Sequence, residues 1–256
     1  MTVTLALSEG IATLTIDRHK ALNALNFSLI SDISEKLDEV RVSDARGLLI
    51  TGAGEKAFCA GADIKELMGR DLMAQKRGAE AGQATFAKIA ALEIPSLALI
   101  NGFAFGGGLE MALACTFRMA VPTAKMGLPE IKLGLIPGYG GTQRLPRLIG
   151  EGRALEMILT GRTVDAEEAL RIGLVNRLTE TADSVADAQG FLGEVTRYGL
   201  PAISFAKEAV TRALDLPIHE GLKVEADLST LSFRTEDADE GLAAFVEKRK
   251  PTFQDR

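Results

Sequence analysis

The first part of the chain alternates between hydrophobic and polar positions and then changes to a helical spacing. Residues 3–7 and 11–15 alternate, and Ser8-Glu9-Gly10 separates the two runs. Because successive side chains of a strand point to opposite faces, this pattern predicts a β-hairpin. Residues 28–42 instead repeat hydrophobic side chains every three or four positions, which predicts a helix. These positions are Leu29, Ile33, Leu37 and Val40.

Two continuous hydrophobic runs farther along the chain indicate buried strands. They cover residues 46–51 and 96–101, and short unbroken runs of this kind suit strands that are covered on both faces. Between them, residues 71–92 are polar on one side and hydrophobic on the other, and this segment ends before Pro95. Strands that alternate with helices predict an α/β fold, and a doubly wound sheet is the first architecture that the alternation suggests.

The chain after Gly150 is mostly helical in its pattern. We expect residues 1–195 to form the core domain that carries the functional site, and residues 196–256 to form a C-terminal helical region. From the pattern alone, these last helices either pack on the core or make subunit contacts. The predicted helical segments cover residues 151–160, 165–172, 183–198, 201–215 and 217–248.

Composition and charge narrow the function classes. The chain has 256 residues, of which 46% are hydrophobic and 25% charged, as in ordinary globular proteins. A net charge of −6 lacks the basic field of a nucleic-acid-binding protein, so we expect no nucleic-acid partner. Residues 1–10 resemble neither a signal peptide nor a membrane anchor, so we expect a cytoplasmic protein without a membrane partner. Cys59 and Cys115 are expected to be buried thiols in a reducing compartment.

Two glycine-containing loops are the first candidates for chemistry. The segment Asn101-Gly-Phe-Ala-Phe-Gly-Gly-Gly-Leu-Glu110 joins a predicted strand to a predicted helix. Consecutive glycines cost conformational entropy, so they favour a backbone that approaches a ligand closely or presents its N–H groups; a tight turn is the alternative. Phe58-Cys-Ala-Gly-Ala-Asp63 is a similar loop. Two N–H donors aimed at one carbonyl oxygen form an oxyanion hole, in which each donor contributes about a hundredfold to a thousandfold in rate.

Two glutamates adjoin these or similar loops. Glu110 follows the three glycines, and Glu130 follows Pro129, which suits the first position of a short helix. For each glutamate, an acid that complements the dipole at a helix start is the alternative interpretation. Their common position beside glycine loops favours a pair that exchanges protons with a substrate.

Several motifs in order carry a resemblance to a known family. They are Ala60-Gly-Ala-Asp63, the glycine loop that ends at Glu110, Leu128-Pro-Glu-Ile-Lys-Leu-Gly134 and Pro137-Gly-Tyr-Gly-Gly-Thr-Gln-Arg144. Together they resemble the signature of the enoyl-CoA hydratase (crotonase) family. The likeness extends from Lys20-Ala-Leu-Asn-Ala-Leu25 to Glu240-Gly-Leu-Ala-Ala-Phe-Val-Glu-Lys-Arg-Lys250. It implies an α/β fold built as a spiral of ββα turns, with a C-terminal helical region, in place of a doubly wound sheet.

The resemblance implies a hydro-lyase that adds water reversibly to a trans-2-enoyl-CoA and yields a 3-hydroxyacyl-CoA, as in the β-oxidation of fatty acids. The N–H groups of Ala62 and Gly107 would bind the thioester oxygen and stabilise an enolate. Glu110 would accept a proton from water, and Glu130 would act as the acid toward C2. One carboxyl group must be protonated while the other is not, which their close approach promotes. No metal or cofactor is implied, because coenzyme A is part of the substrate.

The resemblance also implies further contacts and an assembly. Gly138 matches a position whose N–H helps hold the water, and the coenzyme A contacts map onto Lys20, Ala21, Leu22, Lys56, Ala60, Gly61, Asp63 and Ile64. Phe245 and Lys248 match residues that reach the nucleotide bound by a neighbouring subunit; a solvated helix end is the alternative for these two. A homotrimer or homohexamer is implied, with residues 196–256 as the trimerisation region. His19 departs from the family pattern, which usually has proline there.

Other functions find less support in the sequence. Both glutamates are present, which favours a hydratase over relatives that isomerise, dehalogenate or decarboxylate, and over a non-catalytic acyl-CoA-binding protein. A carnitinyl-CoA dehydratase or an enoyl-CoA isomerase stays as the alternative within the family. Residues 51–57 fit a dinucleotide-binding fingerprint, but the required helix does not follow. No G-x-S-x-G motif is present, and His19 and His219 lie far apart without a cluster of metal ligands around them. The acyl chain length is not evident from the sequence.

Overall fold

The structure, a computed structural model, describes residues 3–256 and divides into two compact units. Among the described residues, the first unit contains residues 3–92 together with Ser96–Leu192, and the second contains Glu93–Pro95 and Gly193–Arg256. The expected division into a core of residues 1–195 and a trimerisation region of residues 196–256 stays a prediction. Within residues 3–256, no helix combines the length and the apolar character needed to cross a bilayer.

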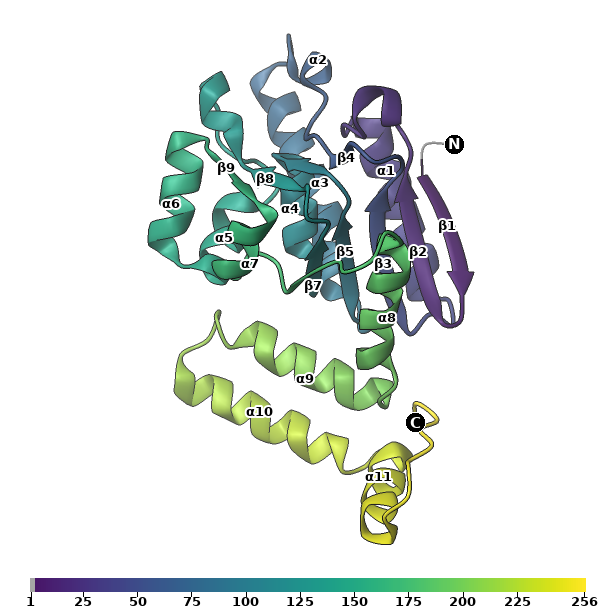
Figure 1. Ribbon diagram of the computed structural model, residues 1–256. Coiled ribbons are helices and arrows are strands. Elements are labelled where there is room, and N and C mark those ends of the chain that lie inside the picture. Colours follow the sequence, from purple (N-terminus) through teal and green to yellow (C-terminus); the bar gives the residue numbers. More distant parts are fainter. Residues whose placement is uncertain (1–2) are drawn as a thin grey trace. The chain divides into compact units, whose positions relative to one another are not determined.

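The first unit contains two sheets (Figure 1). The larger one has six strands in the order β1 (Val3–Ser8), β2 (Ile11–Ile16), β3 (Gly47–Gly52), β5 (Ser96–Ile100), β7 (Phe117–Ala120) and β10 (Arg177–Leu178). The predicted hairpin of β1 and β2 is antiparallel, and the other neighbours are parallel. The smaller sheet has the order β4 (Ala57–Cys59), β6 (Phe103–Phe105), β8 (Lys125–Gly127) and β9 (Thr163–Asp165), in which β9 is antiparallel to β8.

Successive pairs of strands contribute to both sheets in turn. The pairs β3–β4, β5–β6 and β7–β8 each place one strand in the larger sheet and the next in the smaller sheet, and a helical segment follows. This arrangement confirms the ββα spiral with C-terminal helices, and the doubly wound sheet is wrong. Because β4, β6 and β8 have 3 residues each, they are too short to produce a readable alternation.

The core lies between the larger sheet and two long helices. All six residues of β3 are buried, as the continuous hydrophobic run predicts. Helices α1 (Phe27–Arg41) and α3 (Leu72–Ala91) pack together on one face of this sheet (Figure 1). Each begins at a side chain that accepts a hydrogen bond from the first turn: Asn26 from the Leu29 N–H and Asp71 from the Ala74 N–H. Both predicted helices are therefore confirmed.

The remaining helical segments of the first unit connect the strands. They are η1 (His19–Ala21), α2 (Ile64–Leu67), α4 (Gly107–Ala114), η2 (Pro129–Leu133), α5 (Gly141–Ile149), α6 (Glu151–Thr160), α7 (Ala166–Arg171) and α8 (Ser184–Thr196), whose last turn enters the second unit. The region after Gly150 also contains the short strands β9 and β10, which the predicted run of helices lacks. Pairing with β8 and β7 in the fold stabilises these strands, and their own sequence gives little sign of them.

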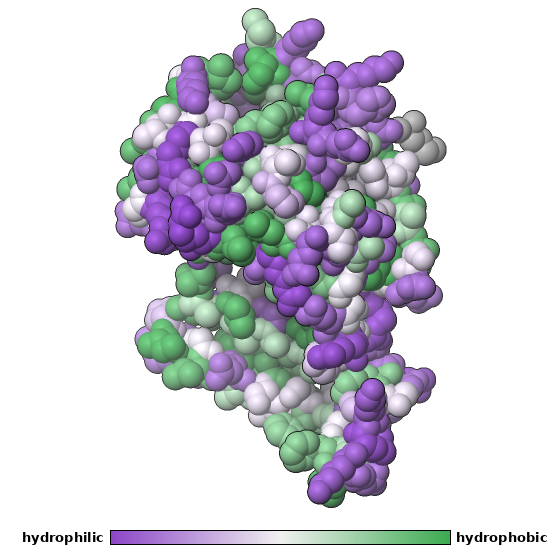
Figure 2. All heavy atoms as spheres, in the orientation of Figure 1, coloured by the Kyte–Doolittle hydropathy of each residue, from purple (hydrophilic) through white to green (hydrophobic). Residues whose placement is uncertain are grey.

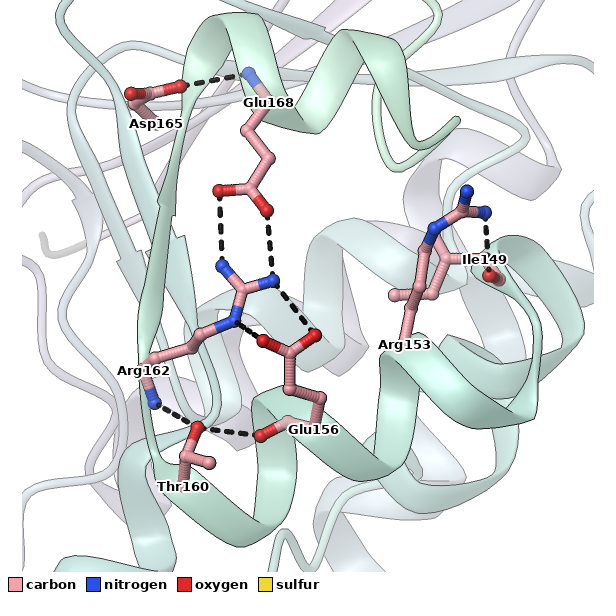
Figure 3. A network of polar contacts seen from close by, with 7 residues as sticks. All are labelled: Ile149, Arg153, Glu156, Thr160, Arg162, Asp165 and Glu168. Atoms are coloured by element: carbon pink, nitrogen blue, oxygen red, sulfur yellow. Dashed lines mark hydrogen bonds and ion pairs between the residues drawn. The ribbon is translucent and has the colours of Figure 1, made fainter.

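An arginine in the turn before β9 connects the two helices on either side of that strand (Figure 3). The guanidinium of Arg162 donates to both carboxylate oxygens of Glu168 in α7, at 2.9 and 3.1 Å, and its Nε lies 2.9 Å from Glu156 of α6. A bidentate pair of this kind fixes orientation as well as distance. The network therefore joins α6 and α7 at the two ends of β9, the strand that pairs with β8.

The second unit consists mainly of α9 (Leu200–Arg212), α10 (Ile218–Ser232) and α11 (Glu236–Glu247). The predicted helical stretch 217–248 is thus divided, because the Thr235 hydroxyl caps α11 by accepting from the Ala238 N–H at 3.1 Å. The buried carboxylate of Asp237 accepts from the Gln254 and Asp255 N–H groups and attaches the final residues to α11.

Hydrophobic side chains remain on the surface of this second unit (Figure 2). Val210, Ile218, Phe245 and Val246 are each more than 70% exposed. In the first unit, Cys59 and Cys115 are buried thiols, as predicted.

Candidate active site

The two glycine loops lie backbone against backbone. Gly61 has a φ of +105°, and a Cβ atom on it would lie 3.0 Å from the Phe105 carbonyl oxygen. A Cβ on Gly106 would in turn lie 3.8 Å from the Gly61 Cα. A side chain at Gly61 would strain the backbone and crowd the facing loop. This contact brings together Ala62 and Gly107, which are the next residues along each loop.

The amides of Ala62 and Gly107 are both available to a ligand. Ala62 forms an isolated bridge with Leu25, in which Leu25 bonds to Gly61 and Asp63, at 2.8 and 2.7 Å, so the Ala62 N–H points to the other side. Gly107 is the first residue of α4, where an amide has no acceptor within the helix. Among residues 3–256, neither N–H donates to a protein group. The two donors can therefore bind one oxygen, and the helix dipole favours negative charge there.

At each position of the triple-glycine loop, neighbouring atoms leave little or no room for a side chain. A Cβ on Gly106 would lie 2.7 Å from the Glu130 Oε1, and one on Gly108 would lie 2.1 Å from the Cys59 carbonyl oxygen. Gly107 lies beside the side chains of Leu25 and Tyr139, and a Cβ atom added to it would lie 3.1 to 3.2 Å from them. The loop is thus packed on three sides, and the interpretation as a merely tight turn does not account for these contacts.

Glu110 lies in the first turn of α4 and is 2% exposed. Its Oε1 accepts hydrogen bonds from the Tyr139 N–H at 2.8 Å and the Gly141 N–H at 2.7 Å. Burial raises the pKa of Glu110 to about 7; the nearby charge of Glu130 also raises this pKa, while both amides and the charge of Arg144 lower it. A pKa near neutrality suits a group that gains and releases a proton.

Glu130 approaches the same helix from η2. Pro129 begins η2, as predicted, and places Glu130 in its first turn. The carboxyl group is half-buried, and burial raises its pKa. Its Oε1 faces the Gly106 backbone, while its buried Oε2 has no hydrogen-bond partner in the described part of the chain. One oxygen of Glu130 is therefore left for a water molecule or a ligand.

These contacts assemble two carboxyl groups and two amides around one end of α4. Glu130 lies beside Gly106, the Gly107 amide follows, and Glu110 is one turn farther on. The charge of Glu130 acts on Glu110, so the two carboxyl groups influence each other's protonation. Chemically, the arrangement can stabilise negative charge on an oxygen while it exchanges protons at neighbouring atoms.

Hydrogen bonds join the loops around residues 20–25 and 53–60, which match coenzyme A contacts of the family. Asn23 is 1% exposed, and its amide donates to the Ala53 and Ala57 carbonyl oxygens at 3.1 and 2.8 Å. The Ala60 N–H donates to the Leu22 carbonyl oxygen at 3.0 Å. An open pocket of about 410 Å³ lies along these loops. It is lined by His19, Leu22, Asn23, Ala53, Gly54, Glu55, Lys56 and Ala57.

Other predicted contact residues have different places in the structure. Lys20 and Ala21 are exposed in η1, whereas Ile64 is exposed at the start of α2. Asp63 caps α2 through the Lys65 N–H and pairs with Arg18 at 3.2 Å, which is a structural role. Gly138 lies in the turn before Glu110's two amide donors, and its carbonyl oxygen accepts from Gln83. In the second unit, Phe245 is 84% exposed and Lys248 ends α11.

Sequence reasoning missed Asn23, Tyr139 and Gly141, whose hydrogen bonds help build the candidate site. Asn23 stands within a quoted motif, and its left-handed φ of 58° shows that it forms part of a specific turn. Tyr139 and Gly141 act through backbone N–H groups, which any residue but proline possesses. The only sequence signal for them is the glycine-rich run from Pro137 to Gly141.

Comparisons with known proteins show the family of the chain. The family model for enoyl-CoA hydratase/isomerase matches residues 6–256. The chain is 42% identical over 246 residues to a crotonyl-CoA hydratase of Syntrophomonas wolfei, covering 96% of this chain and 95% of the relative. It is 39% identical over 244 residues to a short-chain-enoyl-CoA hydratase of Clostridium acetobutylicum, covering 94% of each.

The fold agrees as well. A crystal structure of enoyl-CoA hydratase from Bacillus anthracis matches with a TM-score of 0.95 and 37% identity, covering 100% of both chains. The match of sequence motifs, spiral fold and full-length relatives leads to one conclusion. This chain belongs to the enoyl-CoA hydratase/isomerase family.

Proposed function

We propose that this protein is an enoyl-CoA hydratase, a hydro-lyase that adds water reversibly to a trans-2-enoyl-CoA. The observation that carries the proposal is the assembly at α4, where Glu110 and Glu130 lie beside the Ala62 and Gly107 amides. Full-length relatives named as hydratases support it. Because one of them is a crotonyl-CoA hydratase and another a short-chain hydratase, crotonyl-CoA is the first substrate to test.

In the proposed mechanism, the thioester oxygen lies between the Ala62 and Gly107 amides. A water molecule lies between the two carboxyl groups and adds to C3, while Glu110 accepts its proton. The electrons move toward the thioester oxygen, and the amides stabilise the enolate. Glu130 delivers a proton to C2, which completes the addition of one water molecule. The pair ends with Glu110 protonated and Glu130 ionised. Release of a proton from Glu110 and uptake of one by Glu130, through solvent, restore the starting state.

The glutamates provide the direct test of this function. Glu110→Gln and Glu130→Gln keep the size of each side chain but remove its capacity to exchange a proton, so kcat for crotonyl-CoA should fall by about 10² to 10⁴. The loss of the enoyl-thioester absorbance measures hydration. Glu151→Gln on the exposed start of α6 is a matched control and should keep full activity. Undiminished turnover in either folded active-site variant would exclude that residue as a proton donor or acceptor.

Coenzyme A binding, assembly and location form the finer part of the proposal. We propose that the pocket beside Leu22 and Lys56 accepts part of the coenzyme A moiety, and that Phe245 and Lys248 serve a neighbouring subunit. A homotrimer or homohexamer in the cytoplasm is the proposed working form. The exposed hydrophobic side chains of the second unit support subunit contacts.

A further inference from the structure

We propose that Arg144 is a positioning residue for Glu110: it fixes the Tyr139–Gly141 turn that holds this carboxylate and brings a positive charge to it. The inference deepens the proposed hydratase function and rests on it. Arg144 lies outside every predicted catalytic or contact role, although the Pro137–Arg144 motif ends with it.

The guanidinium of Arg144 folds back over the start of its own helix. Its Nη1 donates to the Tyr139 carbonyl oxygen at 3.1 Å. Gly140 has a φ of +113°, and a Cβ on it would lie 2.3 Å from this Nη1, so the guanidinium occupies the space above Gly140. Arg144 is thus bound to one side of the turn whose Tyr139 and Gly141 amides bind Glu110 from the other side.

The positive charge of Arg144 has no carboxylate partner in direct contact within residues 3–256. Among residues 3–256, no carboxylate forms an ion pair with it, and Glu110 is the carboxylate whose charge acts on it most strongly. The guanidinium is partly buried, which makes its charge less screened than that of a surface arginine. A partly buried cation that forms no ion pair costs free energy, and the nearby charge of Glu110 offsets part of this cost.

The groups around Glu110 shift its pKa in opposite directions. Burial and the charge of Glu130 from η2 favour the protonated form, whereas the Tyr139 and Gly141 amides and Arg144 of α5 favour the anion. The Tyr139 phenol also lies near Glu110, and its pKa is raised to about 12, so it stays neutral. Cys115 lies near Arg144 and is buried. Arg144 is therefore the positive charge that helps Glu110 act as a base near neutral pH.

Two variants of Arg144 distinguish the effect of its positive charge from the effect of its hydrogen bond to Tyr139. Arg144→Gln keeps a hydrogen-bond donor but loses the charge, so the rising limb of kcat/KM against pH should move upward by about half to one pH unit. The rate loss should be about three- to tenfold below pH 7 and should largely disappear above pH 8.5. Arg144→Lys keeps the charge and should restore the position of this limb. Arg147→Gln, on the exposed side of the same helix, should leave the profile unchanged.

Any of three results would overturn the inference. A loss that is equal at every pH, with Lys no better than Gln, would mean that Arg144 only supports the fold. An unchanged profile for Arg144→Gln would mean that it has no role at all. Titration of the Glu110 carboxyl carbon by ¹³C NMR in wild type and Arg144→Gln needs no turnover, and an equal pKa in both would contradict the proposal. Absence of hydratase activity in wild type would instead count against the proposed function.

Discussion

The burial of the Glu110 carboxyl group has a cost in stability. The side chain is 2% exposed, and the burial that poises its pKa near 7 also makes its charged form unfavourable. Two backbone hydrogen bonds offset part of this penalty. The protein therefore retains a proton on this residue over a pH range in which the unfolded chain has already lost it.

This difference predicts a pH-dependent gain of stability in Glu110→Gln. The pKa is raised from 4.5 to about 7 on folding, so wild-type stability falls as pH rises through this window, because the folded state binds more protons than the unfolded state. Glutamine still accepts from both amides but carries no charge. The variant should exceed wild type by about 1 to 3 kcal/mol in the free energy of unfolding at pH 8. At pH 4 the two should nearly agree. Urea titrations at both pH values measure this; an equal gain at both would contradict the proton linkage.

The sequence allowed some residues of the site to be predicted and hid others. Glu110, Glu130 and the glycines stand in contiguous motifs with unusual residue types, so they could be found directly, and the resemblance assigned their roles. Arg144 and Asn23 act through contacts between loops, and Tyr139 contributes its backbone N–H. Such contributions depend on tertiary geometry, which residue type alone does not reveal.

At the scale of elements, the contact between α3 and the Tyr139 turn supports the site. The ring of Tyr139 is 7% exposed and meets Phe86 of α3 edge-on, with 5.7 Å between ring centroids. A Cβ on Gly82, one turn before Phe86, would lie 2.4 Å from the Tyr139 ring. The same tyrosine covers Gly107, so α3 and α4 are joined through one side chain.

We predict that Gly82→Ala destabilises the protein, although alanine usually stabilises a helix. Alanine improves helix propensity by about 1 kcal/mol, but the clash with the tyrosine ring should cost about 1 to 3 kcal/mol more than this gain. Gly190→Ala in α8 is the matched control, because its Cβ would meet nothing within 4 Å, and it should stabilise. Thermal unfolding compares the two. In the double variant with Tyr139→Ala, the two losses should be less than additive; full additivity would show that the clash is not the cause.

The long helices and strands could be predicted from the sequence, whereas the shortest strands could not. The hairpin, α1 and α3 have enough residues for their hydrophobic periodicity to be clear, and their predicted ranges agree with the structure to within a residue or two. The strands β4, β6, β8 and β9 have 3 residues each, and only their neighbours in the sheet define them. A cap at Thr235 likewise divides a stretch that reads as continuous.

At the scale of the whole molecule, the spiral brings together loops that are far apart in the sequence. The loops that follow β4 and β6 meet because these strands are neighbours in the smaller sheet, and β8 adds η2 beside them. Local periodicity indicates strands and helices but not this order, so it suggested a doubly wound sheet. The resemblance to a family supplied the architecture that periodicity could not.

Assembly provides the prediction at this scale. If residues 196–256 make subunit contacts, light scattering should show particles of three or six chains of 27.2 kDa each. Charges placed at exposed hydrophobic positions, as in Phe245→Glu with Val246→Glu, should shift this population toward smaller species. Arg41→Glu, at the exposed end of α1 in the first unit, is the control for a change of charge alone. A wild-type protein that remains monomeric at micromolar concentration would contradict the proposed assembly.

The two buried thiols make the chain suitable for site-specific labelling. Cys59 is fully enclosed, and burial raises its pKa to about 12, so it forms almost no reactive thiolate at neutral pH. Cys115 is only 5% exposed. A cysteine introduced at Met68, which is 72% exposed between α2 and α3, would therefore carry a maleimide fluorophore almost alone. Such a probe would test whether this segment moves when acyl-CoA binds, without any need to remove the native sulfur atoms.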